Sequence, residues 1–312
     1  MLYEQEQVAQ LQNKVIPQQL PEDFVSFWER AVAQVRRVPI QLSREIADTP
    51  YAKTVTTWSI RYNTHDATQI DAYFSYPAGA TGKLPCVIYY HGGSGHRELC
   101  LDIVATGVAC FAMDVRGQGG TSIDRAIYNS GDVNGGLMTK GILDENEFYM
   151  RNIFMDAVRA VDVVSQLPEV DPERIVTYGG SQGGGLSAVA SALSGKSKKA
   201  YISEPSYCCL RQRTLLGSRI FGSTNQYLRA HPEHTDRVFQ VLRYFDVNHM
   251  VSLLNTPSLF SLGLADDVCL PHFVYSAFHH TPAEKEICLY PFTPHCHPPL
   301  FKDRIYREFS QL

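Results

Sequence analysis

Short runs of apolar residues that do not alternate with polar ones recur from residue 86 onward. Runs that are hydrophobic on both faces are typical of strands in a parallel sheet that is covered on both sides. The runs are CVIYY at 86–90, VACFAMDV at 108–115, RIVTY at 174–178, SLFSLGL at 258–264 and EICLYPF at 286–292. They predict the strands of a mostly parallel central sheet.

Helical spacing of apolar residues appears between several of these runs and also near the N-terminus. One such stripe lies in residues 152–167, and another in residues 21–35 includes Phe24, Phe27 and Trp28. Repetition of strand, helix and strand, with right-handed crossovers, gives an α/β fold. We therefore expect an α/β architecture with helices on both faces of the sheet.

Alternation of apolar and polar residues is confined to two runs between residues 53 and 77, which flank the segment NTHDATQ. This pattern predicts an antiparallel N-terminal hairpin.

Two other stretches, at about 119–150 and 204–250, do not fit the succession of strands and helices and have no Pro- or Ser-rich linkers at their ends. We interpret residues 1–312 as one domain with a helical extension over about 1–50 and helical insertions at those two stretches.

Composition and charge narrow the possible partners. The chain has 44% hydrophobic residues and a formal net charge of −4, with no basic run that would attract nucleic acid. Residues 1–14 carry charges and glutamines where a signal peptide needs apolar residues, and no apolar run has the length of a membrane span. We expect a cytoplasmic protein without a nucleic-acid or membrane partner.

The eight cysteines lack the spacing of a disulfide framework and are expected to be free thiols, most of them buried.

The segment GGSQG, at 179–183, lies directly between a predicted strand and an alanine-rich predicted helix. G-x-S-x-G in that position is the sequence of a nucleophile elbow, a sharp turn that exposes a serine hydroxyl. The glycines let the strand and the helix pass without Cβ clashes. Ser181 is therefore a candidate nucleophile, and the backbone N–H of Gln182 is a candidate donor to an oxyanion.

A serine nucleophile needs a histidine base and a carboxylate, which follow it along the chain in that elbow context as Asp and then His. The run SLFSLGLADD offers Asp266 and Asp267, and the loop LYPFTPHCHPPLF offers His295 and His297. The residues alone leave both choices open. The two histidines could also bind a metal with Cys296, but neighbours in an extended loop point apart and no second ligand pair lies nearby. We expect no metal and no other cofactor.

A second oxyanion donor is expected in the loop that follows the run at 86–90. The sequence YYHGGSG, at 89–95, supplies glycines that let backbone N–H groups approach a small oxygen closely. Gly93 is the candidate donor, and Gly92 is the alternative.

Four longer motifs resemble those of a known family. They are DVRGQGGTS at 114–122, MTKGILD at 138–144, YGGSQGGGL at 178–186 and GLAD at 263–266. They are similar to the acetyl xylan esterase and cephalosporin C deacetylase group, carbohydrate esterase family seven, over the chain from the Phe27-Trp28 helix to near Phe309. The resemblance implies an α/β-hydrolase fold and removal of acetyl groups from small acetylated substrates, namely acetylated xylo-oligosaccharides, other sugars or cephalosporin C-like acetates. Members commonly form ring-like hexamers, so it also implies a homo-oligomer.

The same resemblance selects among the candidate residues. It implies that Ser181 is the nucleophile, Asp266 the acid and His295 the base, which lies 29 positions beyond the acid as in the family. Arg116 and Gln118, from the RGQ motif, are implied to brace the loops around the site. Asp267 and His297 become the alternatives.

Two features depart from the family pattern. Pro294-His295-Cys296 stands where Gly-His-Glu is usual, and the loop from His91 looks about four residues shorter, with Gly93 in place of an aromatic residue. We expect a serine esterase that works through an acetyl-enzyme. The alternatives are an α/β-hydrolase of another specificity, such as a thioesterase or small peptidase, and a non-catalytic binding scaffold, which only the altered histidine loop suggests.

Overall fold

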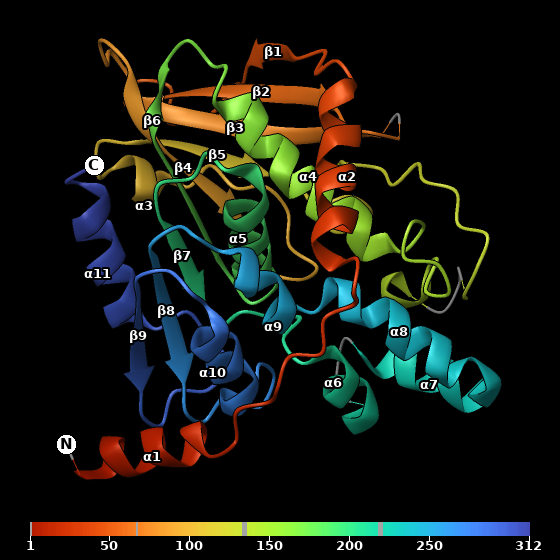
Figure 1. Ribbon diagram of the computed structural model, residues 1–312. Helices are drawn as coiled ribbons and strands as arrows, with labels where there is room; N and C mark the ends of the chain where they lie inside the picture. The colour runs from red at the N-terminus through yellow and green to blue at the C-terminus, as the bar shows by residue number, and fades with distance from the viewer. Residues whose placement is uncertain (1, 67, 133–135, 218–220) are drawn as a thin grey trace.

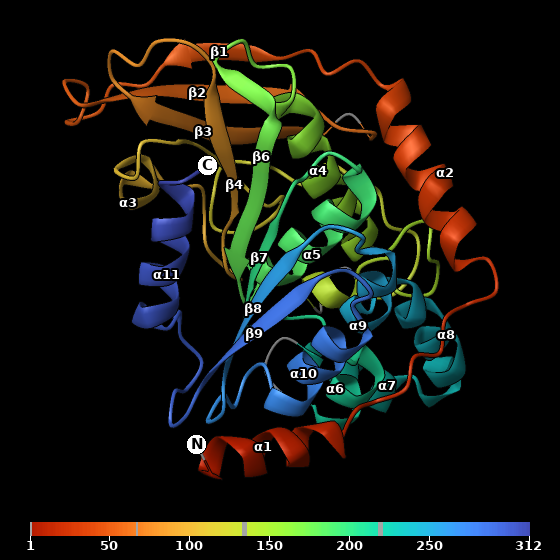
Figure 2. The ribbon, with the colours of Figure 1, turned by 60° about the vertical axis from the view of Figure 1, so that its left-hand side comes forward.

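A single large sheet runs through the molecule in the computed structural model, which describes residues 2–66, 68–132, 136–217 and 221–312 (Figures 1 and 2). Its strands are β1 (Ser43–Ile46), β2 (Val55–Asn63), β3 (Gln69–Pro77), β4 (Leu84–Tyr90), β5 (Ala109–Met113), β6 (Val170–Gly180), β7 (Ala200–Ser203), β8 (Ser258–Gly263) and β9 (Lys285–Tyr290). They lie in the order β1-β2-β3-β5-β4-β6-β7-β8-β9.

The sheet is antiparallel at one edge and parallel over the rest. β1, β2 and β3 pair antiparallel, β3 pairs antiparallel with β5, and every pair from β5 to β9 is parallel. The predicted hairpin is β2–β3, with Trp58 opposite Phe74. The sheet twists so strongly that β2 and β3 run nearly across the direction of β8 and β9 (Figure 2).

Two strands were not expected from the hydrophobic pattern. β1 lies within the N-terminal segment that the pattern suggested to be helical, and all four of its residues are exposed, so it carries no apolar signal. β7 is buried at every position but has only four residues, too few to show a period. Both strands are defined by pairing with a neighbour, which a single-sequence pattern does not report.

Helices cover both faces of the sheet. They are α1 (Leu2–Gln12), α2 (Phe24–Arg37), α3 (Leu101–Val104), α4 (Tyr149–Val164), α5 (Gln182–Ser194), α6 (Leu210–Leu216), α7 (Gly222–Ala230), α8 (Thr235–Phe245), α9 (Val247–Met250), α10 (Pro271–His280) and α11 (Pro299–Phe309), with short 3₁₀ turns η1 (Leu137–Thr139), η3 (Pro232–His234) and η4 (Val251–Leu253). The stretch 204–250 is thus largely helical. In the described part of 119–150, rich in Gly, Asp and Asn, η1 is the one helical turn before α4 begins.

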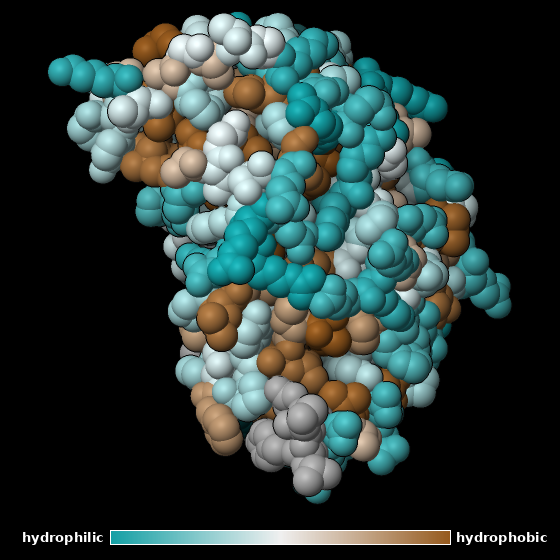
Figure 3. Space-filling view, turned by 90° about the vertical axis from the view of Figure 1, so that its left-hand side faces the viewer, coloured by the Kyte–Doolittle hydropathy of each residue, from teal (hydrophilic) through white to brown (hydrophobic). Residues whose placement is uncertain are grey.

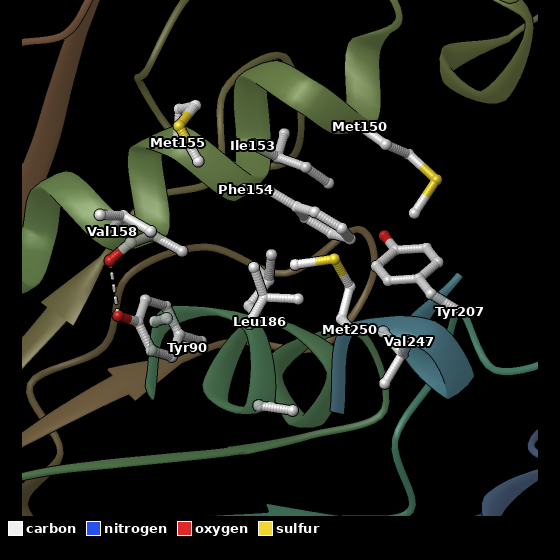
Figure 4. Close-up of a cluster of buried hydrophobic side chains, with 14 of the residues drawn as sticks. Tyr90, Met150, Ile153, Phe154, Met155, Val158, Leu186, Tyr207, Val247 and Met250 are labelled. Atoms are coloured by element: carbon white, nitrogen blue, oxygen red, sulfur yellow. Dashed lines mark hydrogen bonds between the residues drawn. The ribbon is translucent and has the colours of Figure 1, made fainter. Parts of the chain in front are cut away.

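The larger core lies between the sheet and the helices α2, α4, α5, α8 and α9. Figure 4 shows its centre, where Phe154 of α4 lies above Leu186 of α5 and next to Met250 of α9. The hydroxyl of Tyr90, at the end of β4, donates to the carbonyl of Ala157 at 2.8 Å and so anchors α4 to the sheet. This core fixes α5, the helix that follows the candidate nucleophile.

The opposite face of the sheet is covered by α3 and α11. Phe301, Ile305 and Phe309 form the buried side of α11, at the helical spacing expected of an amphipathic helix.

The surface on the side of the molecule that bears α11 is mostly hydrophilic with a few hydrophobic patches (Figure 3). Among the described residues, no helix is long and apolar enough to cross a membrane. All eight cysteines are free and six of them are buried, as expected from the sequence.

We predict that Trp28→Ala in α2 lowers the free energy of unfolding by about 3–5 kcal/mol, because it removes a large buried side chain. Trp28 is 1% exposed, packs against Phe154 and Phe245, and donates its indole N–H to the Tyr244 carbonyl. Glu29→Ala, at the next and exposed position of α2, is the matched control. Urea denaturation of both variants measures the difference, and equal unfolding midpoints would contradict the docking of α2.

Candidate active site

The carboxyl ends of three adjacent parallel strands meet at one edge of the sheet. Ser181 follows β6, Glu204 follows β7 and Asp266 lies in the turn after β8. In open α/β sheets this edge is where ligands bind. The chain therefore gathers a hydroxyl and two carboxyl groups there from segments far apart in the sequence.

Ser181 occupies a strained backbone conformation between β6 and α5. Its φ of 54° lies in the left-handed region, which is uncommon for a residue with a side chain. The turn is possible because its neighbours are glycines: a Cβ on Gly183 would lie 1.9 Å from the Tyr90 carbonyl oxygen, and one on Gly179 would lie 2.5 Å from the Gly183 backbone. This geometry is that of a nucleophile elbow.

Gln182 is the first residue of α5, so its backbone N–H has no acceptor within the helix. The side chain of Gln182 exchanges two hydrogen bonds with the side chain of Gln118, at 2.8 and 3.0 Å. Gln118 also accepts the backbone N–H of Ser94, next to Gly93, at 3.1 Å. One amide side chain thus links the start of α5 to the glycine loop after β4, the two segments predicted to supply oxyanion donors.

Asp266 and His295 form a hydrogen-bonded pair. The Nδ1 atom of His295 lies 2.8 Å from Oδ2 of Asp266, and Oδ1 of Asp266 accepts the backbone N–H groups of Val268 and Cys269, each at 2.8 Å. The Asp266 side chain is fully buried, whereas that of His295 is 24% exposed. Both oxygens of Asp266 are therefore occupied, and its orientation toward His295 is fixed.

The loops that carry this pair are joined through their backbones. Leu264 and Ala265 donate N–H groups to the carbonyls of Tyr290 and Thr293, each at 3.1 Å. A Cβ on Gly263 would lie 2.5 Å from the Thr293 carbonyl oxygen, so only glycine permits this approach. The pairing of Asp266 with His295 thus depends on contact between segments that follow β8 and β9.

Burial lowers the pKa of His295, but the hydrogen bonds that its ring makes to the Asp266 carboxylate and to the Cys269 side chain outweigh burial and hold the pKa well above the ordinary value near 6.5. Asp266, Cys269 and His295 bring possible metal-ligand atoms within 4.8 Å of one another. The 2.8 Å separation within the Asp266–His295 pair is that of a charge-assisted hydrogen bond. It is shorter than the spacing of about 3.3 Å between two ligands that share one zinc ion.

The alternatives Asp267 and His297 have different surroundings. Asp267 is exposed, in contrast to Asp266. The ring of His297 lies on the elbow itself, with its Cε1 atom 1.6 Å from where a Cβ of Gly180 would be. Burial lowers the pKa of His297 to about 4, so this ring is neutral at physiological pH. The structure thus brings His295, and not His297, to Asp266, while His297 shows that the histidine loop reaches the elbow.

Glu204 is a buried acidic residue that the sequence analysis missed. Its carboxyl group accepts the hydroxyls of Ser203 and Ser261 at 2.9 and 3.0 Å, and the residue is 1% exposed. Burial raises the pKa of Glu204 to about 7, although those hydroxyls and the charge of His295 oppose the shift. An acidic residue directly after the apolar run AYIS was the available signal, and it was overlooked because β7 was not recognised.

Arg116 is a fully buried charged residue. Its guanidinium binds both oxygens of Asp156, at 2.6 and 2.7 Å, and also contacts Asp66 and Thr64. The backbone carbonyl of Arg116 accepts the Tyr149 hydroxyl, which also contacts Gln118 at 3.3 Å. Arg116 and Gln118 of the RGQ motif are therefore parts of one hydrogen-bonded network, which Gln118 connects to the glycine loop at Ser94.

The mostly parallel sheet, the helices on both faces and the serine elbow after β6 define an α/β-hydrolase. Comparison with known proteins places the chain more narrowly. The family model described as acetyl xylan esterase (AXE1) matches residues 6–312, and the chain belongs to this family.

Solved structures of similar proteins agree with this assignment. An acetyl xylan esterase from Paenibacillus sp. R4 superposes with a TM-score of 0.92 at 33% identity, over 97% of this chain and 98% of that one. Acetyl xylan esterase 1 from Thermoanaerobacterium sp. JW/SL YS485 gives 0.90 at 28% identity, over the same shares of the two chains. The acetyl esterase Axe7A of Xylanibacter ruminicola is 25% identical over 88% of this chain, which spans only 63% of that relative's length.

We predict that Gly263→Ala lowers kcat/KM for p-nitrophenyl acetate on the order of a hundredfold, because the added methyl group separates the loops that carry Asp266 and His295. Gly222→Ala is the control, since a Cβ there meets only one atom, at an ordinary contact distance of 3.5 Å. Steady-state kinetics and circular dichroism are measured on both variants. Unchanged kcat/KM in folded Gly263→Ala would contradict the dependence of the site on this approach.

Proposed function

We propose that the protein is a serine esterase that removes acetyl groups from small acetylated substrates through an acetyl-enzyme. The observation that carries this proposal is the hydrogen-bonded Asp266–His295 pair at the sheet edge where Ser181 stands on an elbow. Membership in the acetyl xylan esterase family supports the acetyl group as the acyl part. Acetylated xylo-oligosaccharides are the first candidate substrates, and other acetylated sugars and cephalosporin C-like acetates are further ones.

In the proposed mechanism the Ser181 hydroxyl oxygen attacks the acetyl carbonyl carbon while Nε2 of His295 accepts the hydroxyl proton. The Asp266 carboxylate holds His295 with Nδ1 protonated and stabilises the imidazolium that forms. Backbone N–H groups of Gln182 and Gly93 stabilise the oxyanion, which collapses as the alcohol leaves with the proton from His295. Water then attacks the acetyl-enzyme, again with His295 as the base, and acetate is released.

Arg116 and Gln118 take supporting roles in this proposal. The hydrogen bonds of Gln118 with the Gln182 side chain and the Ser94 N–H link the two segments that carry the proposed oxyanion donors. We also propose, from the family resemblance, that the protein is a homo-oligomer. Light scattering of the purified protein tests its oligomeric state.

A cytoplasmic location is supported by the free thiols, because reducing compartments keep cysteines unpaired.

We predict a strong preference for acetyl over longer acyl chains. Each methylene group that the acyl site cannot seat costs about 1–3 kcal/mol of transition-state stabilisation. A series of p-nitrophenyl esters from acetate to octanoate, with kcat/KM measured for each, tests the acyl part, and a panel of acetylated sugars with acetate release tests the alcohol part. Equal kcat/KM for acetate and octanoate, or faster cleavage of thioesters or peptide amides, would overturn the proposal.

Substitution of the proposed nucleophile and the proposed base tests the mechanism. Ser181→Ala and His295→Ala should each lower kcat by three or more orders of magnitude, on the scale of other serine triads, because the residues act as a unit. His297→Ala is the matched control: it removes a ring that packs on Gly180 and that has no carboxylate partner among the described residues, and we expect a loss under about tenfold. A large loss for His297→Ala with activity retained in His295→Ala would move the base to His297.

The pH profile of kcat/KM should rise with pH, because the base must be neutral to accept a proton, and its midpoint should lie above 6.5, since the pKa of His295 is raised. Glu204→Gln removes a carboxylate whose negative charge favours the imidazolium, so the midpoint should move to lower pH. Glu29→Gln, an exposed carboxylate of α2, is the control and should leave it unchanged. A wild-type midpoint below 6.5, or no shift in Glu204→Gln, would contradict these assignments.

A further inference from the structure

Three possible metal ligands converge between α7 and α8, in the segment His231-Pro232-Glu233-His234. The segment belongs to the insertion at 204–250 and lies at the outer edge of the molecule, apart from the sheet edge that bears Ser181 (Figure 1). Its residues take no part in the proposed ester hydrolysis. His231 directly follows α7, and His234 directly precedes α8.

The separations of the ligand atoms are equal to or somewhat longer than those around a bound metal ion. Oε1 of Glu233 lies 3.5 Å from Nδ1 of His231 and 3.9 Å from Nε2 of His234. Two ligands about 2.1 Å from a common zinc ion, at a tetrahedral angle, are about 3.4 Å apart. Both separations exceed those of well-formed hydrogen bonds, about 2.7–3.2 Å, so the carboxylate oxygen stands between the two imidazoles without a tight bond to either.

A third side chain fixes the orientation of His234. The Tyr227 hydroxyl lies 2.7 Å from Nδ1 of His234, and Tyr227 itself is only 7% exposed. When Nδ1–H of His234 donates to the Tyr227 hydroxyl oxygen, the lone pair of Nε2, the atom nearer Glu233, is available to a metal ion. The rings of His231 and His234 are stacked, with centroids 5.3 Å apart and planes 18° apart. The two imidazoles thus lie in nearly parallel planes, and the Tyr227 hydroxyl fixes one of them.

We propose that His231 Nδ1, Glu233 Oε1 and His234 Nε2 bind one divalent transition-metal ion of the zinc type, with water at the remaining position. Two neutral imidazoles and one carboxylate are ligands that zinc accepts, and three protein ligands leave an open coordination position. The side chains of His231, Glu233 and His234 are 47%, 62% and 33% exposed, so an ion reaches them directly from solvent. The bound ion would join the end of α7 to the start of α8.

Isothermal titration of the metal-free protein with Zn²⁺ at about pH 7.5, where most histidines are neutral, tests the site. We expect one ion per chain with a dissociation constant on the order of 10 µM or tighter. His231→Ala and His234→Ala should each weaken binding at least tenfold. Tyr227→Phe, which removes the hydroxyl beside His234, should weaken it about tenfold. His279→Ala, at an exposed histidine of α10, is the matched control and should bind as the wild type does.

Co²⁺ provides a second readout, because a site of two imidazoles and a carboxylate gives visible absorption that His234→Ala should abolish. The metal-free His234→Ala protein should keep wild-type esterase activity, so this test is separate from that of the proposed function. Absence of Zn²⁺ binding at about 100 µM would overturn the proposal. So would binding that persists in the double variant His231→Ala/His234→Ala and disappears in Cys269→Ser, which would assign the ion to the cluster around Asp266.

Discussion

The close approach of α5 to β4 and β6 is the constraint on which the rest of the site depends. Side chains at 179 and 183 would collide with backbone atoms at 2.5 and 1.9 Å, so glycine is required at both positions. This approach forces Ser181 into a positive φ and points the start of α5 at the sheet edge. The strain is held by the core around Phe154 and Leu186, in which α5 is buried along nearly its whole length (Figure 4).

A second close approach, between the turns after β8 and β9, brings the acid and the base together. Each turn contributes one member of the Asp266–His295 pair, and the hydrogen bonds between the backbones fix the separation of the two turns. Because Asp266 is buried and accepts three hydrogen bonds, its negative charge is directed at one imidazole. Glu204 directly follows β7, the strand that lies between β6 and β8. Its carboxyl group is a third polar group at the carboxyl ends of the strands, and its charge changes near neutral pH. The electrostatics of the site thus come from three neighbouring strands.

The insertion at 204–250 shows a different organisation. Its helices pack on one another and on α4 and α5 through Phe245, Met250 and neighbouring apolar residues. The connecting segment 231–234 is not part of this core, and a hydrogen bond joins its His234 to Tyr227, which is, while the rings of His231 and His234 stack on each other. A metal ion there would supply the connection that apolar burial supplies elsewhere. The chain would thus use two unrelated means of fixing polar side chains, one at the sheet edge and one at the periphery.

The sequence by itself determined the class of fold and the positions of its main elements. Runs such as CVIYY and RIVTY are apolar on both faces because both faces of the sheet are covered, and this local signal needs no knowledge of the partner strands. GGSQG likewise predicted the elbow, because the glycines that the turn requires are adjacent in the chain. β1 and β7 were missed because an exposed edge strand and a four-residue strand are defined by pairing alone.

Only the tertiary structure decided how residues distant in the chain combine. The residues alone left Asp266 or Asp267 and His295 or His297 open, and the family resemblance favoured the pair that the structure brings to 2.8 Å. The meeting of Glu204 with Ser203 and Ser261, and the approach of His297 to Gly180, could not be predicted from spacing. The physical reason is that hydrophobic periodicity records which face of an element is buried. The contact between two polar side chains depends instead on strand order and loop path, which that pattern does not record.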